Sequence, residues 1–318
     1  MAESMVDIAL LAFGGPESVD VIPEFLERMT GRPPTDEVVS AVQTRYLAIG
    51  GGSPLPDVTR RQALALQAHL VQRLAFPIRV RAGFLYADPS VADCLRELDG
   101  REVIAVPLSP YKSRLTSDAY RKALDAAGGE RIPLLEGWYA DRGFVHAVSA
   151  RIAEALDGTD AADYAVLFTA HSVPLETILE GDPYVDQIQQ TVAQLVPAVM
   201  PGDWRLGFQS KGRGGGEWVG PEVDDLVREL AAAGWQKLLV VPVGFVSDHV
   251  ETLYDLDVTL RAVVEENGMI YRRSETPNDS SQFIAALADI VVDYLARRPL
   301  EQQLERPEGE HDHGSPRG

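Results

Sequence analysis

The sequence predicts an α/β protein made of two similar halves, each with a parallel four-stranded sheet flanked by helices. Apolar runs of β type alternate with longer amphipathic segments, which is typical of βαβ units. The 318 residues are more than one ordinary core needs, and they fit two domains of typical size. The candidate strands divide equally between the first and second halves of the chain.

The first half is expected to span residues 1–158. Residues 59–75 form its clearest amphipathic helix, because apolar residues recur there every three or four positions. Another helical run, residues 144–158, is followed by polar residues, and the boundary between the halves is therefore placed at its end. The candidate strands of this half are residues 6–13, 78–86, 102–109 and 131–138.

The second half is expected to span residues 159–278, with an amphipathic helix over residues 221–234. A final helix within residues 279–298 is expected to return to the first half and close the fold. Residues 299–318 are polar, contain Pro and Gly, and lack periodicity, which predicts a disordered tail. The candidate strands of this half are residues 164–170, 204–210, 237–246 and 269–275.

The composition excludes several classes of function. A formal charge of -19 disfavours nucleic acid or an anionic membrane as the main partner, because both attract Lys and Arg clusters. No apolar run is long enough to span a bilayer, and the start of the chain lacks the features of a signal peptide, so a cytoplasmic protein is expected. The single cysteine, Cys94, cannot hold an iron–sulfur cluster by itself, and its expected role is packing.

Two polar segments follow candidate strands of the second half. His171 comes directly after the strand of residues 164–170, and residues 247–257 (SDHVETLYDLD) follow the strand of residues 237–246. In open α/β sheets the loops at the carboxyl ends of the strands converge on one crevice. If residues 247–257 form a helix, Asp248, Glu251 or Thr252, and Asp255 project from one face.

An imidazole facing a carboxylate suits a borderline divalent metal such as Fe(II), Co(II) or Zn(II), and the same pair can also move protons. Simpler interpretations compete at each position. His171 can be a loop histidine bonded to a neighbour, and Asp248 is favoured as a helix N-cap. His249 would point away from Asp248 on a helix, so a structural role is expected for it.

The glycine-rich segments 49–56 and 210–218 do not have the form of phosphate-binding loops. Their glycines allow the backbone to approach a flat ligand closely, and Trp218, at the end of the second segment, can stack on such a ligand. In the segment EGDPY, Asp182 is expected to cap a helix with Pro183 as its first residue.

Five motifs resemble those of ferrochelatases in order and spacing, and the resemblance covers about residues 7–297: LLAFGGPES, RYLAIGGGSPL, FTAHSVP with GDPY, GFQSKGRGGGEWVGP and VPVGFVSDHVETLYDLD. The resemblance implies two Rossmann-like halves with a porphyrin cleft between them. It implies insertion of Fe(II) into a porphyrin with loss of two protons, with porphyrin and ferrous iron as substrates and no further cofactor. By the same resemblance, His171 and Glu251 are the metal-binding and catalytic pair.

The resemblance also implies residues around the macrocycle. Asp255 would belong to a secondary acidic path, although Thr259 stands where many members of the family have another acid. Phe13 replaces the tyrosine with which coproporphyrin-type members reach the iron, so it cannot ligate. The positions that correspond to macrocycle or propionate contacts are Phe13, Met29, Arg45, Tyr46, Ser53, Tyr120 and Trp218.

Three functions are therefore compared. The first is a cytoplasmic ferrochelatase, for which protoporphyrin IX is slightly favoured over coproporphyrin III because few cations surround the expected cleft. The second is a chelatase that inserts cobalt or another metal into a tetrapyrrole, since histidine and carboxylate do not select iron by themselves. The third is a tetrapyrrole carrier without turnover, which the presence of both His171 and Glu251 disfavours.

Overall fold

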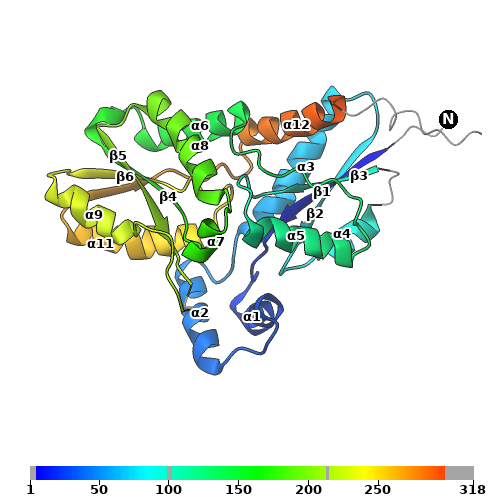
Figure 1. Ribbon diagram of the computed structural model, residues 1–318, viewed down its shortest axis with the longest axis horizontal. Helices are drawn as coiled ribbons and strands as arrows, with labels where there is room; N and C mark the ends of the chain where they lie inside the picture. Colours follow the sequence, from blue (N-terminus) through cyan, green and yellow to red (C-terminus); the bar gives the residue numbers. More distant parts are fainter. Residues whose placement is uncertain (1–4, 99–101, 213–214, 298–318) are drawn as a thin grey trace, which may run out of the picture.

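The computed structural model describes residues 5–98, 102–212 and 215–297, and the predicted tail lies outside them. Two separate parallel sheets form the centres of the two halves, and helices flank each of them (Figure 1). The predicted α/β class is therefore confirmed. The largest cluster of buried apolar residues includes members of both sheets, so the halves share a core.

Strand β1 (Val6–Ala12) is the centre of the first sheet, and it pairs in parallel with β2 (Ile78–Phe84) and β3 (Glu102–Pro107). Every residue of β1 is buried because both faces of the sheet are covered. Successive residues of β1, such as Ile8 and Ala9, point to opposite faces of the sheet and therefore belong to different apolar clusters. The flanking helices are α3 (Leu55–Arg73), α4 (Val91–Glu97) and α5 (Arg114–Ala126). Cys94 of α4 is buried in one of these clusters, as its expected packing role requires.

The predicted fourth strand of the first half is wrong, because the described residues of this half form a sheet of three strands. Residues 131–138 make only an isolated bridge, in which Ala105 pairs with Leu134. The N–H of Ala105 donates to Pro133 and the N–H of Leu135 donates back to Ala105, at 2.8 Å each. Pro133 has no N–H to give, and the chain turns at Gly137, whose φ is +74°, so the ladder cannot continue.

The second sheet has the four predicted strands, in the order β5-β4-β6-β7. They are β4 (Ala165–His171), β5 (Asp203–Gln209), β6 (Lys237–Val241) and β7 (Ile270–Arg273). Helices α9 (Val223–Ala232) and α11 (Arg261–Glu266) cover one face, and α8 (Tyr184–Val199) with α6 (Arg142–Leu156) contributes to the shared core. Helix α8 begins one residue later than predicted, so its N-cap is Pro183 and not Asp182. The Asp182 side chain still accepts a hydrogen bond from the N–H of Tyr184, at 3.0 Å.

Helix α12 (Ser281–Ala296) packs against α6 and α3 (Figure 1). Its residue Phe283 is fully buried and meets the rings of Trp138 and Phe144 at centroid distances of 6.1 and 6.5 Å. The last helix thus contacts elements of the predicted first half. The domain boundary near residue 158 stays a prediction.

Helices α1 (Ile22–Thr30) and α2 (Asp36–Ala48) project from the body of the molecule on one side (Figure 1). A small cluster of Ile22, Phe25, Leu26 and Tyr46 holds them together. The remaining elements are short: 3-10 turns at Val19–Val21 and Ala161–Asp163, α7 (Leu175–Leu179), α10 (Val250–Leu253) and a π-helix at Asp255–Leu260. None of the helices in the described part of the chain combines the length and the apolar character that a membrane span requires.

Phe283→Ala is expected to lower the free energy of unfolding by about 3–5 kcal/mol, because the cavity would open in the core that joins α12 to the first half. Urea denaturation followed by circular dichroism measures this change. Leu64→Ala is the control, since Leu64 is an exposed residue of α3, and its effect is expected to stay within about 0.5 kcal/mol. Equal effects of the two substitutions would contradict the role of Phe283.

Candidate functional site

The site lies where β4 and β6 end, because parallel strands of one sheet present their carboxyl ends at the same edge. Pairing of β4 with β6 ends at Phe168 and Val241, after which β4 continues to His171. The chain that leaves β6 crosses β4 closely: the N–H of Gly244 donates to Thr169 O at 3.0 Å. A Cβ at Gly244 would lie 2.8 Å from Ala170, so only glycine fits this approach.

His171 and Glu251 face each other at this edge. His171 Nε2 lies 3.4 Å from Glu251 Oε1, and the two side chains are 35% and 25% exposed. His171 Nδ1 contacts the carbonyl oxygen of Ser172, which can only accept, so Nδ1 carries a proton and Nε2 is the atom turned to the carboxylate. The carbonyl oxygen of Glu251 accepts from Gln209 Nε2 at 2.7 Å, which fixes its backbone to β5.

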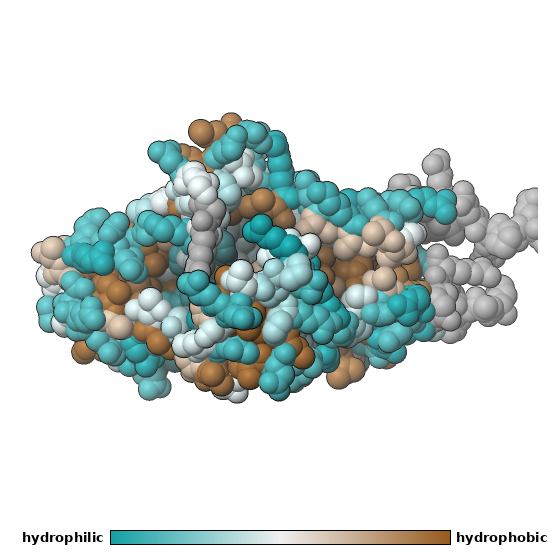
Figure 2. Space-filling model, turned by 90° about the horizontal axis from the view of Figure 1, so that it is seen from below, coloured by the Kyte–Doolittle hydropathy of each residue, from teal (hydrophilic) through white to brown (hydrophobic). Residues whose placement is uncertain are grey.

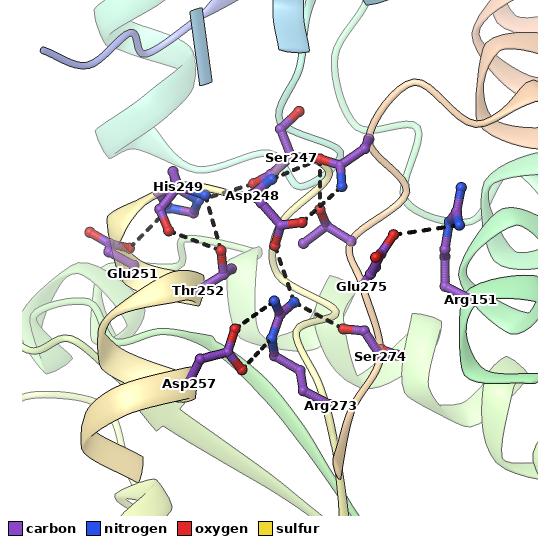
Figure 3. A network of polar contacts seen from close by, with 12 residues as sticks. Arg151, Ser247, Asp248, His249, Glu251, Thr252, Asp257, Arg273, Ser274 and Glu275 are labelled. Atoms are coloured by element: carbon purple, nitrogen blue, oxygen red, sulfur yellow. Dashed lines mark hydrogen bonds and ion pairs between the residues drawn. The ribbon is translucent and has the colours of Figure 1, made fainter. Parts of the chain in front are cut away.

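His249 is a further member of the site. It was expected to be structural, and its Nε2 lies 3.6 Å from Glu251 Oε2 (Figure 3). Because His171 lies beside the other oxygen of Glu251, the carboxylate stands between two imidazoles. His249 is also the N-cap residue of α10, a place predicted for Asp248. The prediction that Asp248 is the N-cap is wrong, because helix α10 starts at Val250 and His249 takes that position. The structural role of His249 stays a prediction. The proximity of histidine and glutamate in the segment DHVE was the available signal.

The two imidazoles and the carboxylate shift one another's ionisation. Burial disfavours the charged form of His171, but the Glu251 carboxylate outweighs it and raises the pKa of His171 to about 9. Burial likewise acts to raise the pKa of Glu251, but His171 and His249 together hold it well below its ordinary value. At pH 7 the pair therefore exists as imidazolium and carboxylate. Its contribution to stability is complete below the ordinary histidine pKa and is lost as the pH rises through about 9.

Asp255 does not share a helix face with Asp248, contrary to the prediction from residues 247–257. Helix α10 contains only four residues, and a π-helix begins at Asp255 and changes the spacing of the side chains. Asp255 instead forms an ion pair with Arg45 of α2, and its other carboxylate oxygen accepts from the hydroxyl of Ser210. The Arg45 guanidinium also lies over the ring of Tyr254, 5.3 Å from its centroid. This contact joins the projecting helices to the second half.

Asp248 makes polar contacts with Arg273, which also binds Asp257 (Figure 3). Its carboxylate accepts from Arg273 Nη1 at 3.1 Å and from Asn278 Nδ2 at 2.8 Å. Arg273 also binds Asp257 with two hydrogen bonds, at 2.9 and 2.7 Å. Because of these bonds, the Asp248 carboxylate is turned toward Arg273 and Asn278 and not toward Glu251.

The predicted macrocycle contacts differ in exposure. Phe13 and Met29 are 43% and 37% exposed, and the Phe13 ring lies 4.6 Å from that of Tyr86. Tyr46, Ser53 and Tyr120 are buried. Tyr46 packs between α1 and α2, and Tyr120 packs against the first sheet. The backbone N–H of Ser53 donates a hydrogen bond to Pro16 O. Phe13 and Met29 therefore offer more surface to a ligand than these three residues do.

Trp218 is partly buried beside the site. Its ring lies against Gly212, where a Cβ would come within 2.6 Å of it, so the glycine-rich segment leaves room for the indole. A cavity of about 350 Å³ is lined by Trp218, Ser172, Gln209, Ser210 and Asp255, among others. It lies beside His171 and Glu251 rather than over them, since neither lines it. Trp218 and Asp255 thus share a cavity wall next to the pair.

A larger cavity, of about 630 Å³, lies between α5, the chain after β2 and the end of α7. Tyr86, Leu115, Arg114 and Lys122 are among its lining residues. Seen from the side on which α1 and α2 project, the surface is hollowed near the middle of the molecule, with apolar residues close to the hollow (Figure 2). The 630 Å³ cavity is lined by both apolar and cationic side chains.

Comparison with known proteins gives consistent matches. A family model described as ferrochelatase matches residues 6–295. The chain is 36% identical to the ferrochelatase of Acidobacterium capsulatum (96% of this chain, 98% of the relative), and 32% identical to the coproporphyrin III ferrochelatase of Anoxybacillus flavithermus (93% and 98%). Among solved structures, SirB from Bacillus subtilis with Fe3+ aligns with a TM-score of 0.59 at 12% identity, covering 94% of this chain and 98% of SirB. That last likeness shows the fold alone.

Glu251→Gln is expected to lower the pKa of His171 by about 1–3 pH units, because the substitution removes the nearby carboxylate and leaves the burial. NMR titration of the His171 imidazole measures this directly, with the wild type expected to titrate near pH 9. Glu229→Gln on α9 removes the same formal charge from a residue paired with Arg205, and serves as the control. An unchanged His171 titration in Glu251→Gln would show that the two groups are not coupled.

Proposed function

The chain belongs to the ferrochelatase family and is an enzyme that inserts Fe(II) into a porphyrin; we propose that His171 and Glu251 handle the metal and the protons. The observation that carries the proposal is the pair itself, with 3.4 Å between His171 Nε2 and Glu251 Oε1 at the edge where β4 and β6 end. An imidazole and a carboxylate are suitable ligands for a borderline divalent cation. Both side chains are also partly exposed, so a substrate can reach them.

Metal insertion requires a base as well as a metal ligand, because the pyrrole nitrogens lose two protons as Fe(II) enters. In the free enzyme His171 is protonated at pH 7, since Glu251 raises its pKa to about 9. An arriving divalent cation displaces this proton, because an imidazole binds a metal only in its neutral form. Once the cation has passed to the porphyrin, Nε2 is free again and can accept one of the pyrrole protons.

His249 supports a route by which protons leave. Its Nε2 is 3.6 Å from Glu251 Oε2, and its Nδ1 is 3.0 Å from the carbonyl oxygen of Ser247. Glu251 can therefore pass a proton from His171 to a second imidazole without moving far. We propose that His171, Glu251 and His249 act in this order.

His171→Ala is expected to lower turnover by about 10²–10⁴-fold while porphyrin still binds, because the imidazole acts on metal and protons and supplies little apolar contact. Turnover is measured by the change in porphyrin absorption with Fe(II), and porphyrin binding by fluorescence quenching. His69→Ala is the control, since His69 lies on α3 outside the site, and it should retain normal turnover.

This assay also separates the competing functions. A carrier without turnover would show spectral change only up to one equivalent of protein, and residual activity of His171→Ala near the wild-type value would refute the role of His171. Repeating the assay with Co(II) and Zn(II) tests the alternative metals, since histidine and carboxylate also bind these ions. A clear preference for Co(II) over Fe(II) would favour the cobalt chelatase.

We further propose that the preferred porphyrin is protoporphyrin IX, which carries two propionates, rather than coproporphyrin III, which carries four. Each additional propionate is recognised best by an additional cationic donor. The arginines of the projecting helices are already engaged: Arg28 contacts Asp88 at 3.1 Å and Glu24 at 2.6 Å, and Arg45 is paired with Asp255. Phe13 also lacks the hydroxyl with which a tyrosine could ligate iron.

The relatives do not settle this choice by similarity. Those named coproporphyrin III ferrochelatase are 31–32% identical to this chain, and those named only ferrochelatase are 33–36% identical. The number and engagement of the cations therefore support the proposal, and the names of the relatives leave both porphyrins open.

Turnover divided by the Michaelis constant is expected to be higher for protoporphyrin IX than for coproporphyrin III at equal Fe(II). Steady-state assays with both porphyrins in the same detergent measure it. A clearly higher value for coproporphyrin III would overturn the preference and would mean that Arg28 or Arg45 exchanges its present partner for a propionate.

We propose a cytoplasmic enzyme without an iron–sulfur cluster. Cys94 is buried in α4, and burial raises the pKa of its thiol to about 12. A thiol of this kind is not a ready metal ligand. The overall charge of -19 supports a protein in which a divalent cation and an organic substrate, rather than nucleic acid, are the partners.

A further inference from the structure

We propose that Arg273, the last residue of β7, is a positioning residue that holds the segment from Asp248 to Asp257 in the geometry that metal insertion requires. The inference rests on the proposed function of Glu251, which lies in the middle of this segment. Arg273 touches neither His171 nor Glu251 in any described contact, so it acts through the two aspartates. Figure 3 shows Arg273 between Asp257 and Asp248.

The Arg273 side chain is only 9% exposed and uses most of its donors. Its Nε and Nη2 bind the two carboxylate oxygens of Asp257 at 2.9 and 2.7 Å, in the bidentate geometry that a guanidinium favours. Its Nη1 donates to Asp248 Oδ1 at 3.1 Å and to Ser274 O at 3.0 Å. One side chain therefore binds both ends of the segment.

The segment from Asp248 to Asp257 needs tertiary contacts, because its short helices are only weakly stabilised by their own backbone hydrogen bonds. Helix α10 has four residues, fewer than an isolated helix requires, and the π-helix that follows is a rare conformation. Glu251 therefore depends on tertiary contacts for its position. Asp248 fixes the entry to α10, and Asp257 fixes the π-helix.

Neighbouring residues also bind Asp248 and Asp257, and these contacts restrict the positions of both carboxylates. Asn278 binds Asp248 through its side-chain amide and through the backbone N–H of Asp248, at 2.8 and 2.9 Å. The hydroxyl of Tyr271 donates to Asp257 Oδ1 at 3.0 Å. Gln62 of α3 donates to Ser247 Oγ at 3.0 Å and thereby ties the start of the segment to the first half.

Arg273→Lys tests the proposal, because lysine keeps the charge and loses the planar fork that reaches two carboxylates. Turnover is expected to fall by about 10–100-fold, as for other residues that orient metal ligands, while the Michaelis constant for porphyrin stays within about twofold. Asp257→Asn keeps the contact of Arg273 with Asp248, and a smaller loss in the same direction is expected. This second variant keeps the test decisive if Arg273→Lys does not fold.

Arg79→Lys is the matched control. Arg79 of β2 binds the buried Asp7 with two hydrogen bonds, at 2.9 and 2.7 Å, in the other half of the molecule. Its substitution should lower the melting temperature about as much as Arg273→Lys does, but turnover should stay within about twofold of the wild type. Equal loss of turnover in both variants would mean that Arg273 contributes only to stability.

A double substitution with Glu251→Gln separates positioning from general damage. If Arg273 acts through Glu251, Arg273→Lys should reduce the residual turnover of Glu251→Gln much less than it reduces that of the wild type. Fully additive losses would overturn the inference. Normal turnover in Glu251→Gln would refute the proposed function instead, whereas a defective Glu251→Gln with a normal Arg273→Lys would refute the inference alone.

Discussion

The parallel pairing of β4 with β6 is the constraint on which the site depends. Because the two strands run side by side in one direction, the residue that ends β4 and the chain that leaves β6 emerge at the same edge. His171 and Glu251 are 80 positions apart in the sequence, yet this pairing places their side chains 3.4 Å apart. The buried core of β4 and β6 thus fixes a distance on which the chemistry depends.

The sequence predicted the α/β class, and seven of the eight candidate strands are present. These strands could be predicted because a strand that is buried on both faces has a continuous apolar run. It failed at residues 131–138, where the apolar pattern is present but Pro133 and Gly137 interrupt the ladder. It also failed at residues 247–257, since a pattern of carboxylates assumes one regular helix. The short α10 and the π-helix are set by tertiary contacts that the spacing of residues does not encode.

The same reasoning explains which site residues were found. His171 and Glu251 were identified from their positions after two strands and from the resemblance to a family, and the structure brings them together. The proximity of His249 to Glu251 was not predicted, because the orientation of His249 depends on where α10 begins. Arg273, which we propose as a positioning residue, was not predicted from the sequence, because its partners Asp257 and Asp248 lie 16 and 25 positions earlier.

The carboxylates of the segment from Asp248 to Asp257 all have a basic partner, although the whole chain carries a charge of -19. Glu251 lies between two imidazoles, Asp255 meets Arg45 and Ser210, and Arg273 neutralises part of the charge of Asp248 and Asp257. A divalent cation that binds these carboxylates must therefore displace a proton or a basic side chain, because no carboxylate of the segment lacks a partner. The energy of that replacement subtracts from metal affinity, which suits an enzyme that must release its metal into the substrate.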